Sequence, residues 1–518
     1  MKTYYLLLLL LLGIGTKAAW AQQAGQKIDL DIQATTTWSD YEKNYDTPIG
    51  MGYLNGKYFS AGLNENGFVY TVKNKVTISR YDSATKLEKE YEFELMHKDE
   101  PATPIYFFTT QDKAYLIYRS KSADKIWYFY AWEIDPTTLT QVGEPIELLS
   151  KKLPSWRNKK IDRSEDGKYL TLTLVHGGTF NRPLMVHVSC FDNNLQLQYQ
   201  QEAVLAPDVR DININSLQLD ESGGVTISLF INKSTANSYK KSKAAYLYFS
   251  EHIASPYIEY VNSSKGRYVR SASATTDDNH LLMCTVFAKK KATKNADWFT
   301  VVERIPKPDK NDGKPTEITL PMNGGIDDPY GDDRESMRSN SCLRKFLHFS
   351  YWDGYGYLLV TEDLVVNTSS DNRSTDDPDS HIYNIIYQYS IVLTAMLLDE
   401  NLTPRWVTHF PKDISPSLGI GRYLVEQTPQ HVSLVFDAGK SDGMDNGIGI
   451  LRMLPDGGYD MADFQEKERS FEWLWANKAV KLDTGKFLTL YSKGILMGKR
   501  SLGVLNINST PLPASPKE

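Results

Sequence analysis

Eight segments of the chain share one pattern: a short polar turn followed by a strand in which apolar and polar residues alternate. In "LDTGKFLTLYSKG", for example, the turn is Leu482 to Gly485 and the alternation runs from Lys486 to Tyr491. The first strand residues after the turns are Phe68, Tyr115, Tyr169, Val225, Leu281, Tyr357, Val432 and Phe487. The steps between them are about 47, 54, 56, 56, 76, 75 and 55 residues, and a near-constant step indicates a repeat architecture.

Further strand patterns joined by Asp- and Asn-rich turns follow these anchor residues, as in "FDNNLQLQYQ" and "LDENLTPRW". A step of roughly 50 to 60 residues fits one four-stranded propeller blade with generous loops. The sequence therefore predicts an all-β fold, a β-propeller of seven or eight four-stranded blades. Two or more β-sandwich domains are the alternative. Ring closure is expected to pair "KIDLDIQ" near residue 27 with "SLGVLNI" near residue 501.

The predicted organisation is a single propeller-like domain over residues 22–510. The two long steps contain polar insertions near 305–338 and 363–380, which we expect to be surface loops. Residues 464–480 are the one helix candidate after the N-terminus, and residues 511–518 are expected to be a frayed tail.

The N-terminus has the pattern of a secretory signal peptide over residues 1–21. A basic start is followed by an apolar run from Tyr4 to Leu12 and by Ala19-Trp20-Ala21, a small-x-small cleavage pattern. The mature chain is expected to begin at Gln22 and to be periplasmic or extracellular. Because no other window approaches 18 apolar residues, no transmembrane segment is predicted.

Composition narrows the class of partner. The chain is 41 % apolar and 12 % aromatic, enough to bury a large core. Removing residues 1–21 leaves 56 basic and 64 acidic residues, a net charge of −8, which argues against nucleic acid as a partner. Cys190, Cys284 and Cys342 lie in apolar strand patterns, and we expect buried thiols with at most one bridge.

The signal peptide, the turn-strand units such as "SEDGKYLTLTL" and the "LDENLTPRW" phrase together resemble large secreted propeller-like proteins of Bacteroidota type. Many of those proteins have no assigned function. The resemblance implies export and a propeller fold for most of the mature chain, and it carries no catalytic residues.

The most suggestive ligand-binding stretch is "HFSYWDGYGYLLV", in which Tyr351, Trp352, Tyr355 and Tyr357 surround two glycines. Exposed aromatic faces stack on sugars or hold peptide side chains. The competing interpretation is that Trp352 and Tyr357 are ordinary core residues of a blade.

Acidic residues in the first insertion suggest a metal site. Asp327, Asp328, Asp332 and Asp333 supply hard oxygen ligands of the kind that calcium prefers, although no Asp-x-Asp-x-Asp-Gly loop is present. A pair of the carboxylates in the insertions would alternatively serve glycoside hydrolysis.

No catalytic motif has its required context. Gly439 to Gly443 matches Gly-x-Ser-x-Gly, but strand patterns lie on both sides and no histidine follows it. We therefore expect a secreted, non-catalytic binding protein that presents blade loops to a glycan, peptide or protein partner. The alternatives are a polysaccharide-acting enzyme that uses paired carboxylates and a structural component of the envelope.

Overall fold

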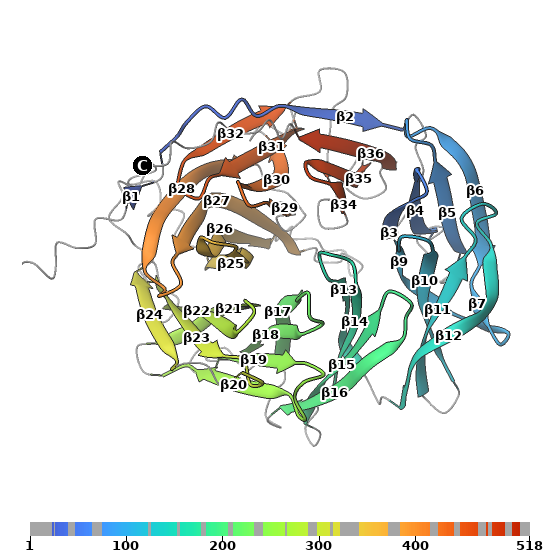
Figure 1. Ribbon diagram of the computed structural model, residues 1–518, viewed down its shortest axis with the longest axis horizontal. Helices are drawn as coiled ribbons and strands as arrows, with labels where there is room; N and C mark the ends of the chain where they lie inside the picture. Colours follow the sequence, from blue (N-terminus) through green and yellow to red (C-terminus); the bar gives the residue numbers. More distant parts are fainter. Residues whose placement is uncertain are drawn as a thin grey trace, which may run out of the picture.

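The protein is a β-propeller of eight blades, seen along its ring axis in Figure 1. This computed structural model describes residues 23–24, 26–39, 47–64, 75–122, 126–152, 156–177, 183–205, 211–232, 242–264, 267–288, 298–310, 314–321, 341–370, 384–414, 423–439, 446–464, 473–474, 479–492 and 500–507. Every regular element in these residues is a β-strand. No helix within them is long and apolar enough to cross a membrane.

Each blade is an antiparallel sheet whose first strand is innermost. Blade 1 comprises β3 (Thr47–Leu54), β4 (Lys57–Asn64), β5 (Lys75–Tyr81) and β6 (Leu87–Glu94), and blade 2 comprises β9 (Thr103–Thr109), β10 (Ala114–Lys121), β11 (Ile126–Ile134) and β12 (Gln141–Lys152). Blade 3 comprises β13 (Trp156–Arg163), β14 (Tyr169–Gly177), β15 (Leu184–Asp192) and β16 (Leu197–Leu205). Blade 4 comprises β17 (Asp211–Leu219), β18 (Val225–Asn232), β19 (Lys243–Phe249) and β20 (Tyr257–Asn262). A short hairpin of β7 (Met96–His97) and β8 (Glu100–Pro101) joins blades 1 and 2.

Blades 5 to 8 repeat the same order. Blade 5 comprises β21 (Tyr268–Thr276), β22 (His280–Ala288), β23 (Trp298–Pro306) and β24 (Thr316–Pro321), and blade 6 comprises β25 (Ser341–Trp352), β26 (Gly356–Ser370), β27 (Asn384–Leu398) and β28 (Pro404–Ile414). Blade 7 comprises β29 (Tyr423–Gln427), β30 (Val432–Gly439), β31 (Asn446–Met453) and β32 (Tyr459–Phe464). Blade 8 comprises β33 (Trp473–Leu474), β34 (Val480–Asp483), β35 (Lys486–Ser492), β36 (Arg500–Ile507) and β2 (Ala34–Trp38). The predicted propeller is confirmed, with eight blades.

The predicted repeat units correspond to the blades. The anchor residues from Tyr115 to Phe487 all lie in the second strand of blades 2 to 8. In blade 1 the second strand is β4, so the equivalent residue is Tyr58 and not Phe68, which lies outside the described residues. This correction lengthens the first step from about 47 to about 57 residues, close to the steps that follow it. The sequence does not single out "LNGKYF" as the repeat unit of blade 1, because "LNENGFVYTV", a few residues later, has the same pattern of a polar turn followed by a strand.

Parts of the predicted loops are strands. Within the first insertion, Thr316–Pro321 forms β24, the outer strand of blade 5. Within the second insertion, residues 363–370 continue β26 as far as Ser370. The helix expected over 464–480 is also not observed in its described residues, because Phe464, Trp473 and Val480 lie in strands.

The N-terminal segment closes the ring, as expected, but in a different register. Ala34–Trp38 pairs antiparallel with β36, from Ala34 opposite Ile507 to Trp38 opposite Gly503. The preceding "KIDLDIQ" stretch lies instead along blade 7, where the Ile28 amide donates to the Tyr459 carbonyl at 2.8 Å. Further upstream, β1 (Gln23–Ala24) pairs with β28 of blade 6. The chain therefore runs along the outer edges of three consecutive blades, as the blue trace in Figure 1 shows.

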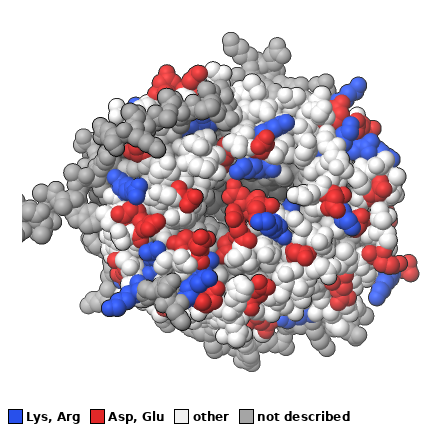
Figure 2. Space-filling view, viewed as in Figure 1, with Lys and Arg blue, Asp and Glu red and all other residues white. Residues whose placement is uncertain are grey.

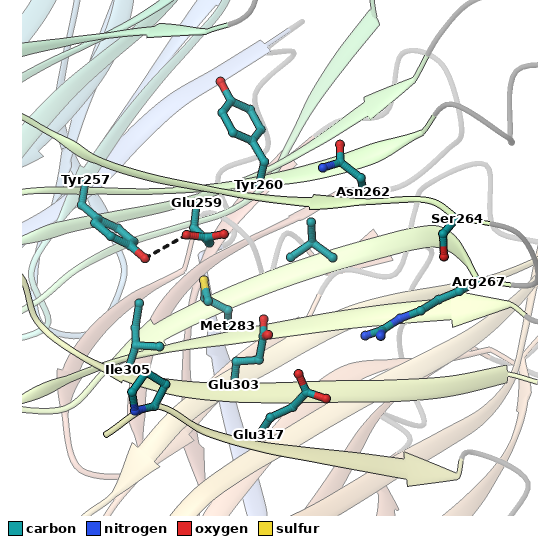
Figure 3. Close-up of a pocket in the computed structure, with 12 residues that line it drawn as sticks. Tyr257, Glu259, Tyr260, Asn262, Ser264, Arg267, Met283, Glu303, Ile305 and Glu317 are labelled. Carbon is teal, nitrogen blue, oxygen red and sulfur yellow. Dashed lines mark hydrogen bonds between the residues drawn. The ribbon is translucent and has the colours of Figure 1, made fainter. Parts of the chain in front are cut away.

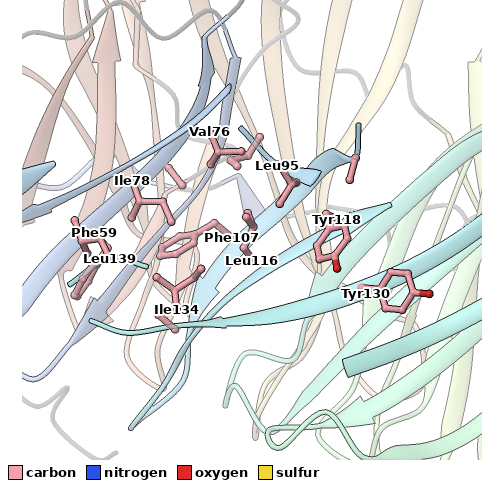
Figure 4. Close-up of a cluster of buried hydrophobic side chains, with 14 of the residues drawn as sticks. Phe59, Val76, Ile78, Leu95, Phe107, Leu116, Tyr118, Tyr130, Ile134 and Leu139 are labelled. Atoms are coloured by element: carbon pink, nitrogen blue, oxygen red, sulfur yellow. The ribbon is translucent and has the colours of Figure 1, made fainter. Parts of the chain in front are cut away.

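Blades 1 and 2 share one continuous eight-stranded sheet, because their inner strands β3 and β9 pair in parallel. The contact is at Gly50, where a Cβ atom would stand 2.0 Å from the Phe107 carbonyl oxygen. Only glycine permits so close an approach of two backbones. Figure 4 shows the buried cluster between the two blades, with Phe59 and Ile78 from blade 1 facing Phe107 and Leu116 from blade 2.

Substitution of Gly50 by alanine is expected to separate the inner strands of blades 1 and 2. Because the new methyl group meets backbone and not a movable side chain, we expect a loss of at least ~3 kcal/mol in the free energy of unfolding. The measurement is urea denaturation. The control is Gly143→Asn, at an exposed position with φ of +63° and open space around the Cβ, which asparagine tolerates. Equal stability of the two variants would contradict the proposed role of Gly50.

Candidate functional site

Two of the four aromatic residues singled out in the sequence belong to the core. Trp352 is 1 % exposed and Tyr357 is fully buried. Trp352 packs in the junction between blades 6 and 7 and donates its Nε1 hydrogen to the Thr428 carbonyl at 2.8 Å. Tyr357 packs between blades 5 and 6 and donates its hydroxyl to Asp277 of blade 5. Both rings are used in blade packing, as the competing interpretation expected, and are not exposed for stacking on a ligand.

The other two aromatic residues are half-buried, Tyr351 near the end of β25 and Tyr355 in the turn that joins β25 and β26. Tyr351 lies 5.3 Å from the Tyr357 ring and donates its hydroxyl to Glu400 Oε1 at 3.2 Å. Tyr355 meets the edge of Trp352 at 5.5 Å. Each ring therefore already has one face against the core, and a ligand-binding role for Tyr351 and Tyr355 stays a prediction.

The predicted calcium ligands lie outside the described residues. Asp327, Asp328, Asp332 and Asp333 all fall in the range 322–340, so the calcium site stays a prediction. Across the described residues, no group of three His, Cys, Asp or Glu side chains is arranged to hold a metal ion. Cys190 and Cys284 are buried free thiols, as expected, and the side chain of Cys342 is among those not described.

The centre of the ring carries polar side chains. Figure 2 shows acidic and basic side chains gathered beside the hollow near the centre of one face. An ion pair of 3.0 Å between Glu165 and Lys481 links the β13–β14 turn of blade 3 to β34 of blade 8. A side chain of one blade thus reaches a blade that is not its neighbour in sequence.

A Ser–His contact near the same centre resembles a catalytic pair, but its hydrogen bond runs in the wrong direction for the histidine to act as a base. His348 Nε2 lies 2.6 Å from Ser350 Oγ, and both contact Gln427 Oε1. The Gln427 amide nitrogen donates to the Tyr351 carbonyl, so its oxygen must face the other two groups as an acceptor. Ser350 therefore donates to Gln427 and accepts from His348. Its hydroxyl is not activated as a nucleophile, and the group ties blade 6 to blade 7.

A groove of about 430 Å³ lies between the outer strand of blade 4 and the face of blade 5. Tyr257 and Glu259 come from β20, and Glu303 and Glu317 come from β23 and β24. Figure 3 shows the three carboxylates directed into one space, with Arg267 extending from the opposite side. The remaining lining residues are Tyr260, Val261, Asn262, Ser264, Met283, Ile305 and Pro315.

Sheet register determines this arrangement. Glu303 and Glu317 are directly opposite each other on β23 and β24, so their side chains emerge on the same face. Tyr257 and Glu259 are two residues apart on β20 and also share a face, where the Tyr257 hydroxyl donates to Glu259 Oε2 at 3.1 Å. Like charges directly opposite on neighbouring strands are destabilising, so this placement is costly for folding.

The carboxylates repel one another, and the charge of Arg267 offsets this repulsion only in part. Burial, followed by the charges of Glu317 and Glu259, raises the pKa of Glu303 to about 6, although Arg267 acts in the opposite direction. Among the described residues, none of the three glutamates forms an ion pair. Arg267, the cation that lines the groove, is held instead over the Phe287 ring at 4.1 Å. The groove therefore carries excess negative charge above pH 6.

Sequence reasoning did not identify these residues. Glu259, Glu303 and Glu317 are separated by 44 and 14 positions and lie in three different strands. The one available signal was the alternation "YIEYV", "VVERI" and "TEITL", in which a glutamate interrupts an apolar strand pattern. Only the register of blade 5 and its contact with blade 4 bring the three together.

Comparisons with known proteins return the fold alone. No protein-family model matches the chain, and no curated protein matches it significantly. The β-propeller domain of the Trilobed protease from Pyrococcus furiosus is 10 % identical, covering 82 % of this chain and 96 % of that one, with a TM-score of 0.33. A polysaccharide lyase, Uly1, is 9 % identical, covering 90 % and 92 %, with a TM-score of 0.37. An apocarotenoid oxygenase from Synechocystis is 9 % identical, covering 85 % and 97 %, with a TM-score of 0.35. Scores this low support no inference about activity.

Replacing Glu303 by glutamine is expected to stabilise the protein at neutral pH. A raised carboxyl pKa means that ionised Glu303 opposes folding, and an amide of similar shape removes the charge. We expect a gain on the order of 1 kcal/mol above pH 6, after allowing for partial solvent screening. The gain should disappear below about pH 4.5, where the wild-type carboxyl is protonated in both states. Thermal unfolding across this pH range measures it. A destabilised variant at pH 7.5 would contradict the repulsion.

Proposed function

We propose that the protein is a non-catalytic binding protein whose groove between blades 4 and 5 holds a cationic ligand. The ligand class that fits is a lysine- or arginine-bearing segment of a peptide or protein. The observation that carries the proposal is the cluster formed by Glu259, Glu303 and Glu317, which lines a groove and has no ion-pair partner among the described residues.

A cationic group relieves the cost that the fold incurs at this site. Burial is the main cause of the raised pKa of Glu303, and the charges of Glu317 and Glu259 add to it. The repulsion between these charges falls when a positive charge enters the groove. Tyr257 stands beside the carboxylates on the same face of β20, and phenol rings attract ammonium and guanidinium groups through their faces. The volume of about 430 Å³ is within the range of small-ligand sites and exceeds the size of one side chain.

A glycosidase role is less well supported by the same residues. Glycosidases separate their two carboxyl groups by about 5 Å or more, so that a sugar or a water fits between them. Glu303 and Glu317 are directly opposite each other on adjacent strands, close enough for the charge of Glu317 to raise the pKa of Glu303. A neutral glycan would also leave the negative charge of the groove uncompensated.

Titration calorimetry with a short oligoarginine peptide tests the proposal. Wild-type protein should bind it at pH 7.5, more weakly in high salt, and more weakly as the pH falls through about 6 and Glu303 is protonated. The double variant Glu303→Gln/Glu317→Gln should bind about tenfold more weakly. The matched control is Glu94→Gln, an exposed glutamate on β6, which should bind as the wild type does.

Two outcomes would reject the cationic ligand. One is equal affinity of the double variant and the wild type. The other is a thermal shift with a neutral polysaccharide and none with the peptide, because a ligand of the folded state raises the melting temperature by mass action.

We further propose that the protein is exported and that its mature chain begins at Gln22. The support is the pattern of residues 1–21, and residue 22 immediately precedes β1 at the edge of blade 6. N-terminal sequencing of protein recovered from the periplasm or medium should return Gln-Gln-Ala-Gly. Recovery of the chain from the cytoplasm with Met1 intact would refute export.

A further inference from the structure

The junction between blades 2 and 3 has an apolar half and a polar half. Phe108, Tyr115 and Leu149 of blade 2 pack against Leu170 and Phe191 of blade 3. Further along the same sheet faces, the polar half brings together side chains from four strands, namely Lys151 of β12, His176 of β14, His187 of β15 and Glu202 of β16. Neither the fold nor the ligand groove requires two buried histidines at this place.

Three basic nitrogens face one carboxylate oxygen. The Lys151 ammonium donates to Glu202 Oε2 and lies 3.1 Å from His187 Nδ1. His176 Nε2 and His187 Nδ1 each lie 3.6 Å from the same Oε2 atom. The Lys151–Glu202 ion pair is therefore a direct tie between the outer strands of neighbouring blades, and both imidazoles stand close enough to compete for it.

Both histidines are held neutral at pH 7. Each residue is 4 % exposed, and burial together with the Lys151 charge lowers the pKa of His176 to about 4 and that of His187 to about 3. His187 Nε2 contacts Ser189 Oγ at 3.1 Å and Gln200 Nε2 at 3.0 Å. His176 Nε2, by contrast, has no hydrogen-bond partner among the described residues and is directed at Glu202.

Charged side chains of both signs lie on these sheet faces. Glu133, opposite Tyr115 at the apolar end, pairs with Lys113. Arg119 and Lys121 of β10 lie on the same sheet face as Ile117, which packs in the junction. Lys159 of β13 pairs with Leu174, which packs there too. An additional proton on either histidine therefore adds a second positive charge beside Lys151 at Glu202.

We propose that the blade 2–blade 3 junction is a proton-sensitive clasp, in which protonated His176 and His187 displace Lys151 from Glu202. An imidazolium donates to the carboxylate and repels the ammonium. The Lys151 side chain is 25 % exposed and has a route to solvent. Because the folded-state pKa values lie below the ordinary value of 6.5, the cost of acidification begins as the pH falls through 6.5 and grows toward pH 4. The clasp is closed at neutral pH.

Hydrogen exchange on the intact protein, read by mass spectrometry, tests the clasp. After correction for intrinsic rates, peptides from β12 and β16 should exchange about tenfold faster at pH 5 than at pH 7.5. Peptides from β35 and β36 of blade 8, which contain no His, Asp or Glu, should change little, which separates local opening from global unfolding. The double variant His176→Gln/His187→Gln should abolish the acid effect. His252→Gln, at an exposed histidine beside Glu251, should keep it.

A second variant tests the clasp without altering the histidines. Lys151→Met removes the tie, so β12 should exchange quickly at both pH values with no further increase in acid. Two results would overturn the proposal. One is an acid effect of wild-type size in the histidine double variant. The other is wild-type protection of β12 at pH 7.5 in Lys151→Met.

Discussion

The hydrophobic core of this protein is divided into eight layers, and each layer forms only where the sheet faces of two neighbouring blades pack together. Eight separate clusters of buried apolar side chains occupy the eight junctions, including the one where Met51 and Tyr58 of blade 1 meet Leu488 and Val504 of blade 8. A single four-stranded blade has two apolar faces and cannot bury either one alone. Stability therefore depends on completing the ring.

Burial of both faces also determines where chemistry can occur. Polar groups inside a junction must find partners there, as Trp352 does with the Thr428 carbonyl and His348 with Gln427. Clusters of charged groups lie at the margins, where the outer strand of one blade meets the next blade. The glutamate-lined groove beside β20 and the Lys151–Glu202 contact beside β12 are both at such margins.

The sequence predicted the repeat because local signals repeat with it. The turns carry Asp, Asn or Gly at fixed places, and several have a residue with positive φ, such as Leu195 and Leu402 after Asp192 and Asp399. These signals depend on the backbone of a few adjacent residues, so one sequence suffices to find them. The segment that closes the ring was not identified, because Lys27 to Gln33 alternates like a strand whereas Ala34 to Trp38 is mostly threonine. Only contacts with blades 7 and 8 show which of the two pairs with β36.

The sites were much less accessible to sequence reasoning. The aromatic stretch at 351–357 was conspicuous because its residues are adjacent, yet two of its rings are core. The groove was not visible because its three glutamates come from strands whose pairing, and whose neighbouring blade, are properties of the assembled ring. Proximity in sequence was thus a poor guide to proximity in space wherever a residue's partner lies in another blade.

The N-terminal segment along blades 6, 7 and 8 has a consequence for the order of events during synthesis. It leaves the ribosome before its partners Trp406, Tyr459 and Leu505, which are made hundreds of residues later. Blades 1 to 7 form from contacts between adjacent segments, whereas the last blade must retrieve a strand that has waited throughout. During that interval β2 and the edge that becomes β36 are unpaired strands, which is the state most prone to pairing with another chain. The pairing of β2 with β36 therefore closes the longest loop in the chain, and the entropy of loop closure makes it the contact that local structure favours least.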